Sequence, residues 1–183
     1  MSNKAAVLLA DGFEEIEAVT PVDILRRAGF DVVVAGVGGL TLTGSRALKV
    51  SADTLIDHLD PDLDILVLPG GGLGARNLGM SPQARTLTER VIAAGGIVGA
   101  ICAAPVLTLG AWGLLSGKKA TCFPGMENKF PKDVLFSVDP VVIDGKIVTS
   151  RGAGTAMVFS LALIKSTMGE EKVEEIARTI VLS

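Results

Sequence analysis

The segment GIVGAICAAPVL (residues 96–107) joins an apolar run to a run of small residues. We interpret residues 96–102 as a buried strand and expect a helix to start at residues 104–109. Cys102 therefore falls at a strand-to-helix turn. A cysteine at such a corner is either a small hydrophobic residue of the core or a thiol held in place for chemistry.

The rest of the chain repeats this alternation of strand and helix. Pro21 lies inside a segment with helical spacing and predicts a break or kink there, and Asp144-Gly145 marks the turn of a hairpin. We expect strands at 5–10, 31–37 and 64–72, two short strands within 40–50, helices at 13–29, 81–94, 155–168 and 170–180, and a hairpin at 141–150. The alternation predicts an α/β fold with a doubly wound, mostly parallel sheet sandwiched by helices, and a small β-hairpin.

Composition limits the classes of protein to which the chain can belong. With 183 residues, 49% of them hydrophobic, and a mean hydropathy of +0.51, the chain fits one domain over residues 1–183 with a buried parallel sheet. The net charge of −3, without a basic block, gives no nucleic-acid footprint. No apolar run is long enough for a signal peptide or a membrane span. Two cysteines form no disulfide framework, which favours a cytoplasmic location.

Three loops are expected to meet at the carboxyl ends of the parallel strands, where α/β sheets bind ligands. They are residues 11–17, 69–74 and 102–105. Together they would bring the Cys102 thiol close to the carboxyl groups of Glu14, Glu15 and Glu17 and to unobstructed glycine amides.

Other candidate sites are weaker. GGGLGARN lacks the ending and spacing of a phosphate-binding loop. His58 stands among several aspartates, which is more often a solvated surface than a metal site, so we expect neither cofactor nor metal. If residues 119–123 form a strand, Cys122 and Phe123 point to opposite faces, and Cys122 is more simply a structural residue.

Four motifs in order, ADGFEEIEAVTPVDILRRAG, LPGGGLGARNL, AICAAP and VTSRGAGTA, resemble the ThiJ/PfpI superfamily, and specifically its parkinsonism-associated deglycase branch. The resemblance implies a flavodoxin-like sandwich, usually a homodimer, with a reactive cysteine on a nucleophile elbow. It assigns that cysteine to Cys102 and its contacting acid to Glu17. It places the backbone amides of Gly71 and Ala103 in an oxyanion pocket, and Arg46 in the pocket across the dimer interface.

Two positions depart from the family's pattern. Ala103 stands where the hydrolytic branch has a histidine after the cysteine, which argues against a peptidase. Phe123 stands where the glyoxalase and deglycase branch often has a histidine. A hemithioacetal needs only a thiol and a proton shuttle, so slow glyoxalase or deglycase activity on reactive dicarbonyls and their adducts stays open. The alternative is a redox sensor or chaperone in which an oxidant converts Cys102 to a sulfinate.

These assignments carry physical expectations. Cys102 should have a strained backbone, as nucleophile elbows do. A helix N-terminus should lower the pKa of its thiol, and burial should keep Glu17 protonated near neutral pH. In a twofold dimer formed through the helix at 13–29, Arg46 would reach the partner's acidic loop at Glu14 and Glu15.

Overall fold

The computed structural model describes residues 3–182 and contains a central seven-stranded sheet in the order β10-β11-β7-β6-β1-β2-β5. All neighbouring strands in it pair in parallel except β10 and β11, which form an antiparallel hairpin. The strands are β1 (Lys4–Leu9), β2 (Asp31–Gly36), β5 (Thr54–Leu55), β6 (Ile65–Leu68), β7 (Ile97–Ile101), β10 (Val141–Asp144) and β11 (Ile147–Ser150).

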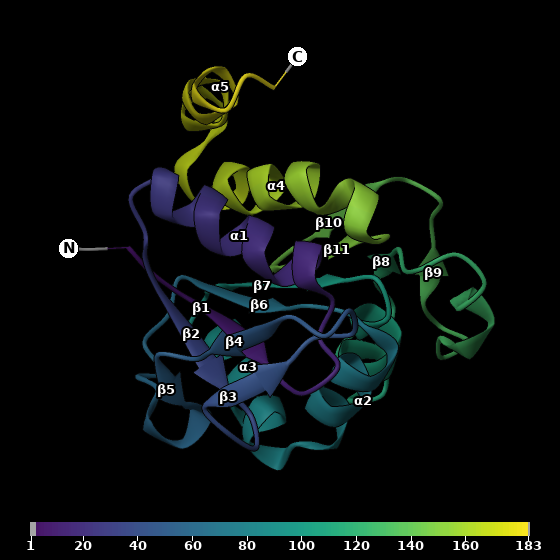
Figure 1. Ribbon diagram of the computed structural model, residues 1–183. Helices are drawn as coiled ribbons and strands as arrows, with labels where there is room; N and C mark the ends of the chain where they lie inside the picture. Colours follow the sequence, from purple (N-terminus) through teal and green to yellow (C-terminus); the bar gives the residue numbers. More distant parts are fainter. Residues whose placement is uncertain (1–2, 183) are drawn as a thin grey trace.

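Helices cover both faces of this sheet (Figure 1). Alternate residues of β1 show the division: Ala5, Val7 and Leu9 pack in one apolar cluster, and Ala6 and Leu8 pack in the other. Burial on both faces explains the continuous apolar runs in the sequence. One face carries α1 (Glu15–Arg27) and α4 (Ala156–Met168), and the other carries α2 (Gly72–Met80), α3 (Pro82–Ala93) and the π-helical turn η2 (Pro105–Gly110). The predicted flavodoxin-like α/β fold is confirmed.

Smaller elements complete the described part of the chain. The antiparallel pair of β3 (Thr41–Thr43) and β4 (Lys49–Ser51) confirms the short strands expected within 40–50. A parallel pair joins β8 (Lys119–Ala120) to β9 (Leu135–Phe136). Single 3-10 turns are η1 (Ile56–His58), η3 (Glu127–Lys129) and η4 (Ala153–Thr155), and α5 (Glu170–Thr179) packs on α4. Within residues 3–182, no helix has both the length and the apolar composition to cross a bilayer.

Two features differ from the sequence predictions. The helix α1 runs from Glu15 to Arg27 without the break expected at Pro21, and Pro21 itself is buried. The helix continues because the packing of its buried face outweighs the one backbone hydrogen bond that proline cannot donate. The helix α2 was not expected, since its sequence is rich in glycine. Its glycines are needed for close packing: a Cβ at Gly74 would lie 2.6 Å from Phe13 N, and one at Gly79 would lie 2.1 Å from Leu107 O.

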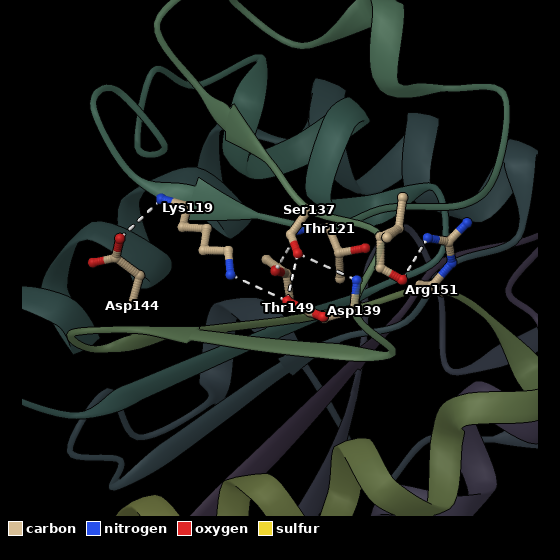
Figure 2. A network of polar contacts seen from close by, with 8 residues as sticks. Lys119, Thr121, Ser137, Asp139, Asp144, Thr149 and Arg151 are labelled. Carbon is tan, nitrogen blue, oxygen red and sulfur yellow. Dashed lines mark hydrogen bonds and ion pairs between the residues drawn. The ribbon is translucent and has the colours of Figure 1, made fainter.

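A polar network fastens the β8–β9 segment to the hairpin β10–β11 (Figure 2). The backbone amide of Lys119 donates to Asp144 Oδ2 at 2.8 Å, and that of Thr121 donates to Thr149 Oγ1 at 3.0 Å. Further along, Arg151 donates to the carbonyl of Val138 at 2.9 Å. These bonds fix residues 119–121 beside β11, and they thereby place the next residues at the carboxyl end of β7.

Candidate functional site

Cys102 is the first residue after β7 and has a left-handed backbone conformation, with φ of 65°. Its amide donates to the carbonyl of Ser150 at 3.0 Å, and its own carbonyl accepts from the amide of Phe123 at 2.9 Å. A non-glycine residue in this region costs about 1–3 kcal/mol and persists only where the surroundings impose it. Here two neighbouring segments impose it, and the predicted strain at the elbow is confirmed.

Glu17 lies in the first turn of α1, and its side chain lies next to Cys102. The residue is only 1% exposed, and Gly70 N donates to its Oε2 at 3.0 Å. Its carboxyl group lies beside the Cys102 side chain, and each group shifts the pKa of the other. A Cβ at Gly70 would lie 2.5 Å from Glu17 Oε2 and 2.6 Å from Cys102 Cβ. Only glycine at position 70 therefore lets the two side chains meet.

Burial governs the protonation of this pair. It raises the pKa of Glu17 to about 7, against the opposing effect of the neighbouring Cys102 thiol and of the hydrogen bond from the Gly70 amide. Burial also raises the pKa of the Cys102 thiol to about 12, and the charge of Glu17 adds to this rise. The backbone amides of Gly71 and Ala103 act in the lowering direction but are outweighed.

The expected lowering of the thiol pKa is therefore wrong. The helical turn after Cys102 is short, and the thiol lies in apolar surroundings next to a carboxylate, so desolvation and like-charge repulsion dominate. Because the two groups are coupled, they titrate as a pair that loses its first proton near pH 7. A thiolate forms readily only in the state in which Glu17 holds the remaining proton.

A cavity of about 500 Å³ opens onto Cys102. The expected convergence of three loops is present, because the lining comes from the start of α1, from the glycines after β6 and from the elbow itself. Three further segments complete it, namely the β3–β4 turn, residues 123–126 and Ala153. The lining residues are Glu14, Glu17, Ser45, Arg46, Gly71, Gly72, Cys102, Ala103, Phe123, Pro124, Gly125, Met126 and Ala153.

The carboxyl groups of Glu14 and Glu15 have different partners and different roles. Glu14 lines the cavity and caps α1, since Glu17 N donates to its Oε2 at 2.9 Å. Glu15 does not line the cavity. Its carboxylate instead holds the β3–β4 turn, accepting from Arg46 N at 2.6 Å and from Ser45 Oγ at 3.1 Å. Burial acts against these bonds, but together they lower the pKa of Glu15.

Arg46 lies on that turn and lines the cavity of its own chain. Its guanidinium donates to the carbonyl of Ser45 at 3.3 Å. Within residues 3–182, it forms no ion pair with a carboxylate of the chain.

The remaining candidates lie apart from this cavity. Cys122 is fully buried, and burial raises its pKa to about 11. His58 belongs to η1 and lines a separate hollow. Among residues 3–182, no cluster of three or more His, Cys, Asp or Glu side chains is arranged to hold a metal.

Sequence reasoning missed several lining residues. Ser45 lies next to Arg46, and Ala153 lies within the fourth motif, so both could have been found from their neighbours. Pro124 and Met126 follow Phe123, which aligns with a histidine of the family, so the same reasoning could have found them.

Comparison with known proteins places this geometry among relatives. Residues 3–166 match the DJ-1/PfpI family. The chain is 39% identical over 186 residues to Protein dj-1beta of Drosophila melanogaster, covering 100% of this chain and 99% of that protein. It is 30% identical over 186 residues to the glutathione-independent glyoxalase DJR-1.2 of Caenorhabditis elegans, covering 100% and 98%. It is 40% identical over 183 residues to Protein DJ-1 homolog B of Arabidopsis thaliana, covering 99% of this chain and 42% of that longer protein.

Solved structures agree along the whole chain. The crystal structure of Drosophila melanogaster DJ-1beta superposes with a TM-score of 0.95 at 39% identity, covering 100% of both chains. Oxidised Toxoplasma gondii DJ-1 superposes with a TM-score of 0.94 at 36% identity, covering 98% of both chains. With the family match spanning residues 3–166 and full-length relatives at 30% to 39% identity, this chain belongs to the DJ-1/PfpI family.

Proposed function

We propose that this protein is a cysteine-dependent carbonyl-stress enzyme that converts α-oxoaldehydes to 2-hydroxy acids without glutathione. One observation carries the proposal: the strained Cys102 lies beside Glu17, whose pKa is raised to about 7, in the lining of an open cavity. A carboxyl group with a pKa near the working pH can both accept and donate protons. The glyoxalase name of the C. elegans relative supports the same chemistry.

The first step is addition of the Cys102 sulfur to the aldehyde carbon. Glu17 accepts the thiol proton as the S–C bond forms, and the electron pair of the carbonyl bond moves to oxygen. The backbone amides of Gly71 and Ala103, which already act on the sulfur, stabilise this oxygen as negative charge develops. The proton then moves to the oxygen and gives a neutral hemithioacetal.

The second step moves hydrogen between the two carbons. The Glu17 carboxylate removes the proton from the former aldehyde carbon, giving an enediol, and returns a proton to the neighbouring carbon. The product is a thioester of a 2-hydroxy acid on Cys102, in which one carbon has been oxidised and the other reduced. Water hydrolyses the thioester and frees the thiol, so the overall reaction adds one water and needs no external oxidant.

Turnover of methylglyoxal in the absence of glutathione tests the proposal. We expect lactate to form with wild-type protein and not with Cys102→Ser. Cys122→Ser is the matched control and should retain turnover, because that thiol is buried and outside the cavity. Lactate formation that survives Cys102→Ser would refute the assignment.

A redox sensor is the second candidate. The close match to an oxidised relative favours it, since Glu17 in its protonated form could donate to a sulfinate oxygen on Cys102. Mass spectrometry after mild peroxide should then show two oxygen atoms added at Cys102 and none at Cys122. Such oxidation in protein that turns over no dicarbonyl would favour the sensor over the enzyme.

We further propose that the protein forms a twofold homodimer through α1. Ile16 and Val19 are one turn apart on this helix and are 54% and 50% exposed, and Leu48 on the neighbouring hairpin is 50% exposed. The Arg46 guanidinium on the same hairpin would then be available to Glu14 of a second copy.

Sedimentation tests the dimer. Wild type should be a dimer at micromolar concentration and Val19→Glu a monomer, whereas Val138→Glu, at an exposed position on another surface, should stay dimeric. Arg46→Ala should weaken the dimer or change the reactivity of Cys102. A monomeric wild type would remove the proposal. Because both cysteines are free thiols, we also propose a reducing, cytoplasmic location.

A further inference from the structure

Phe123 is an aromatic residue held in the open beside the reactive thiol. It is 47% exposed, whereas Phe13, Phe30 and Phe159 are buried in the core. The ring lines the cavity that contains Cys102. Two hydrogen bonds fix its backbone: Phe123 N donates to Cys102 O at 2.9 Å, and Met126 N donates to Phe123 O at 3.1 Å. The fold therefore maintains an exposed apolar side chain at this position.

The ring also lies close to the proton-transferring group. A Cβ at Gly152 would be 3.5 Å from Phe123 Cδ2 and 3.8 Å from Glu17 Oε1, so the ring edge and the carboxyl group flank the same glycine. A phenyl ring offers neither a proton nor a hydrogen-bond acceptor in the plane of the ring. Its contribution to this site must come from shape and apolar contact.

The cavity wall around Phe123 is apolar as well. Pro124, Met126 and Ala103 line it alongside the ring, whereas the ionisable carboxyl and guanidinium groups of the lining belong to Glu14, Glu17 and Arg46 on other segments. Once the aldehyde carbon of a substrate R–CO–CHO is bound to the Cys102 sulfur, the cavity must also hold the substituent R. The volume of about 500 Å³ leaves space for a group as large as a phenyl ring.

We propose that Phe123 is a specificity-determining residue that packs against the substituent R, so that the site favours α-oxoaldehydes with an aromatic or branched aliphatic group. This inference rests on the proposed glyoxalase function. Contact between two aromatic rings contributes a selectivity of about two- to tenfold beyond simple burial of area.

The kinetic test compares phenylglyoxal with glyoxal, whose substituent is a hydrogen atom. The ratio of their kcat/KM values should fall by about two- to tenfold in Phe123→Ala, and by less in Phe123→Leu. Phe136→Ala is the matched control, because Phe136 is an exposed phenylalanine of β9 outside the cavity, and it should leave the ratio unchanged. A ratio that is unchanged or higher in Phe123→Ala would overturn the proposal, since the ring would then be a bystander or an obstruction.

A second measurement keeps this test separate from the glyoxalase function. Phenacyl bromide and iodoacetamide both alkylate thiols, and only the first would present an aromatic group to the apolar wall beside Cys102. The ratio of their alkylation rates should fall in Phe123→Ala and not in Phe136→Ala. If the wild-type protein turns over no dicarbonyl but the ratio falls in Phe123→Ala, the proposed glyoxalase function is refuted, and the proposed contact of Phe123 with the substituent is supported. If the ratio does not change, the wall is refuted whatever the turnover.

Discussion

Replacing Glu17 with glutamine should change the way in which Cys102 loses its proton. In the wild-type protein, burial and the charge of Glu17 raise the thiol pKa to about 12, and the pKa of Glu17 itself is raised to about 7. Glutamine keeps the size of the side chain and can still hydrogen-bond to sulfur, but it can neither take the thiol proton nor carry a charge.

The size of the effect follows from the closeness of the two groups. Coulomb's law gives about 3 kcal/mol for two unit charges about 5 Å apart at an effective dielectric constant of about 20, which corresponds to about 2 pKa units. The Cys102 pKa should therefore fall by about 2 units in Glu17→Gln. It should not fall below the ordinary thiol value, because burial is the larger cause of the rise and remains.

The assay is the rate of Cys102 alkylation by iodoacetamide as a function of pH, followed by mass spectrometry. In wild type the rate should rise to a plateau near pH 7, because above this pH the pair holds one proton and the fraction with a thiolate is constant. In Glu17→Gln a single thiol titrates, so the rate should keep rising through neutral pH. An inflection near pH 7 that persists in Glu17→Gln would refute the coupling.

Glu14→Gln provides the control for this experiment. It removes another carboxylate of the same cavity, but one whose charge contributes to raising the pKa of Glu17. The inflection should remain in this variant and move to lower pH.

Three more outcomes follow from the same contacts. Because the pKa of Glu17 is raised from 4.5 to about 7 in the folded state, the folded protein holds its proton more tightly, and stability should fall by about 3 kcal/mol as pH rises across that window; urea unfolding should show this fall in wild type and not in Glu17→Gln. Gly70→Ala, whose Cβ would lie 2.6 Å from Cys102 Cβ, should lose about 1–3 kcal/mol of stability in urea unfolding, and its Cys102 should be alkylated more slowly. In the control Gly72→Ala the new Cβ would have no atom within 4 Å, so neither stability nor the alkylation rate should change. Cys122, fully buried, should be alkylated only when denaturant unfolds the chain, and labelling of Cys122 at native-state rates would contradict its assigned place.

Most of the main sheet was predictable, because β1, β2, β6 and β7 are short, continuous apolar runs. The 141–150 hairpin was also predicted, although its loop residues are Gly145 and Lys146, one position later than expected. The strands β5, β8 and β9 have two residues each and carry no periodic signal. Hydrogen bonds to distant parts of the chain create these strands, and a sequence of two residues is too short to show the alternation that predicts a strand.

The candidate site divides in the same way. The expectation that a parallel sheet gathers its loops at the carboxyl ends of its strands brought Cys102 together with Glu14, Glu15 and Glu17, and the family resemblance singled out Glu17 among them. The direction of the thiol pKa was not found, because it depends on how completely the chain surrounds the sulfur. The role of Glu15 was also unpredictable: whether a carboxylate faces a cavity or a neighbouring turn is decided by contacts with Ser45 and Arg46, distant in sequence.

The hydrogen bonds that shape the elbow have a consequence for the order in which the protein is made. Cys102 is held by Ser150 and Phe123, both of which leave the ribosome after it. Until β11 has been synthesised and has paired with β7, residue 102 is free to relax, and its thiol is an ordinary exposed one with an ordinary pKa. Once the sheet is complete, the sulfur lies in the wall of the cavity, and only electrophiles that fit the cavity can reach it. A chain that stalls before this point would be chemically distinguishable from a finished one by its cysteine.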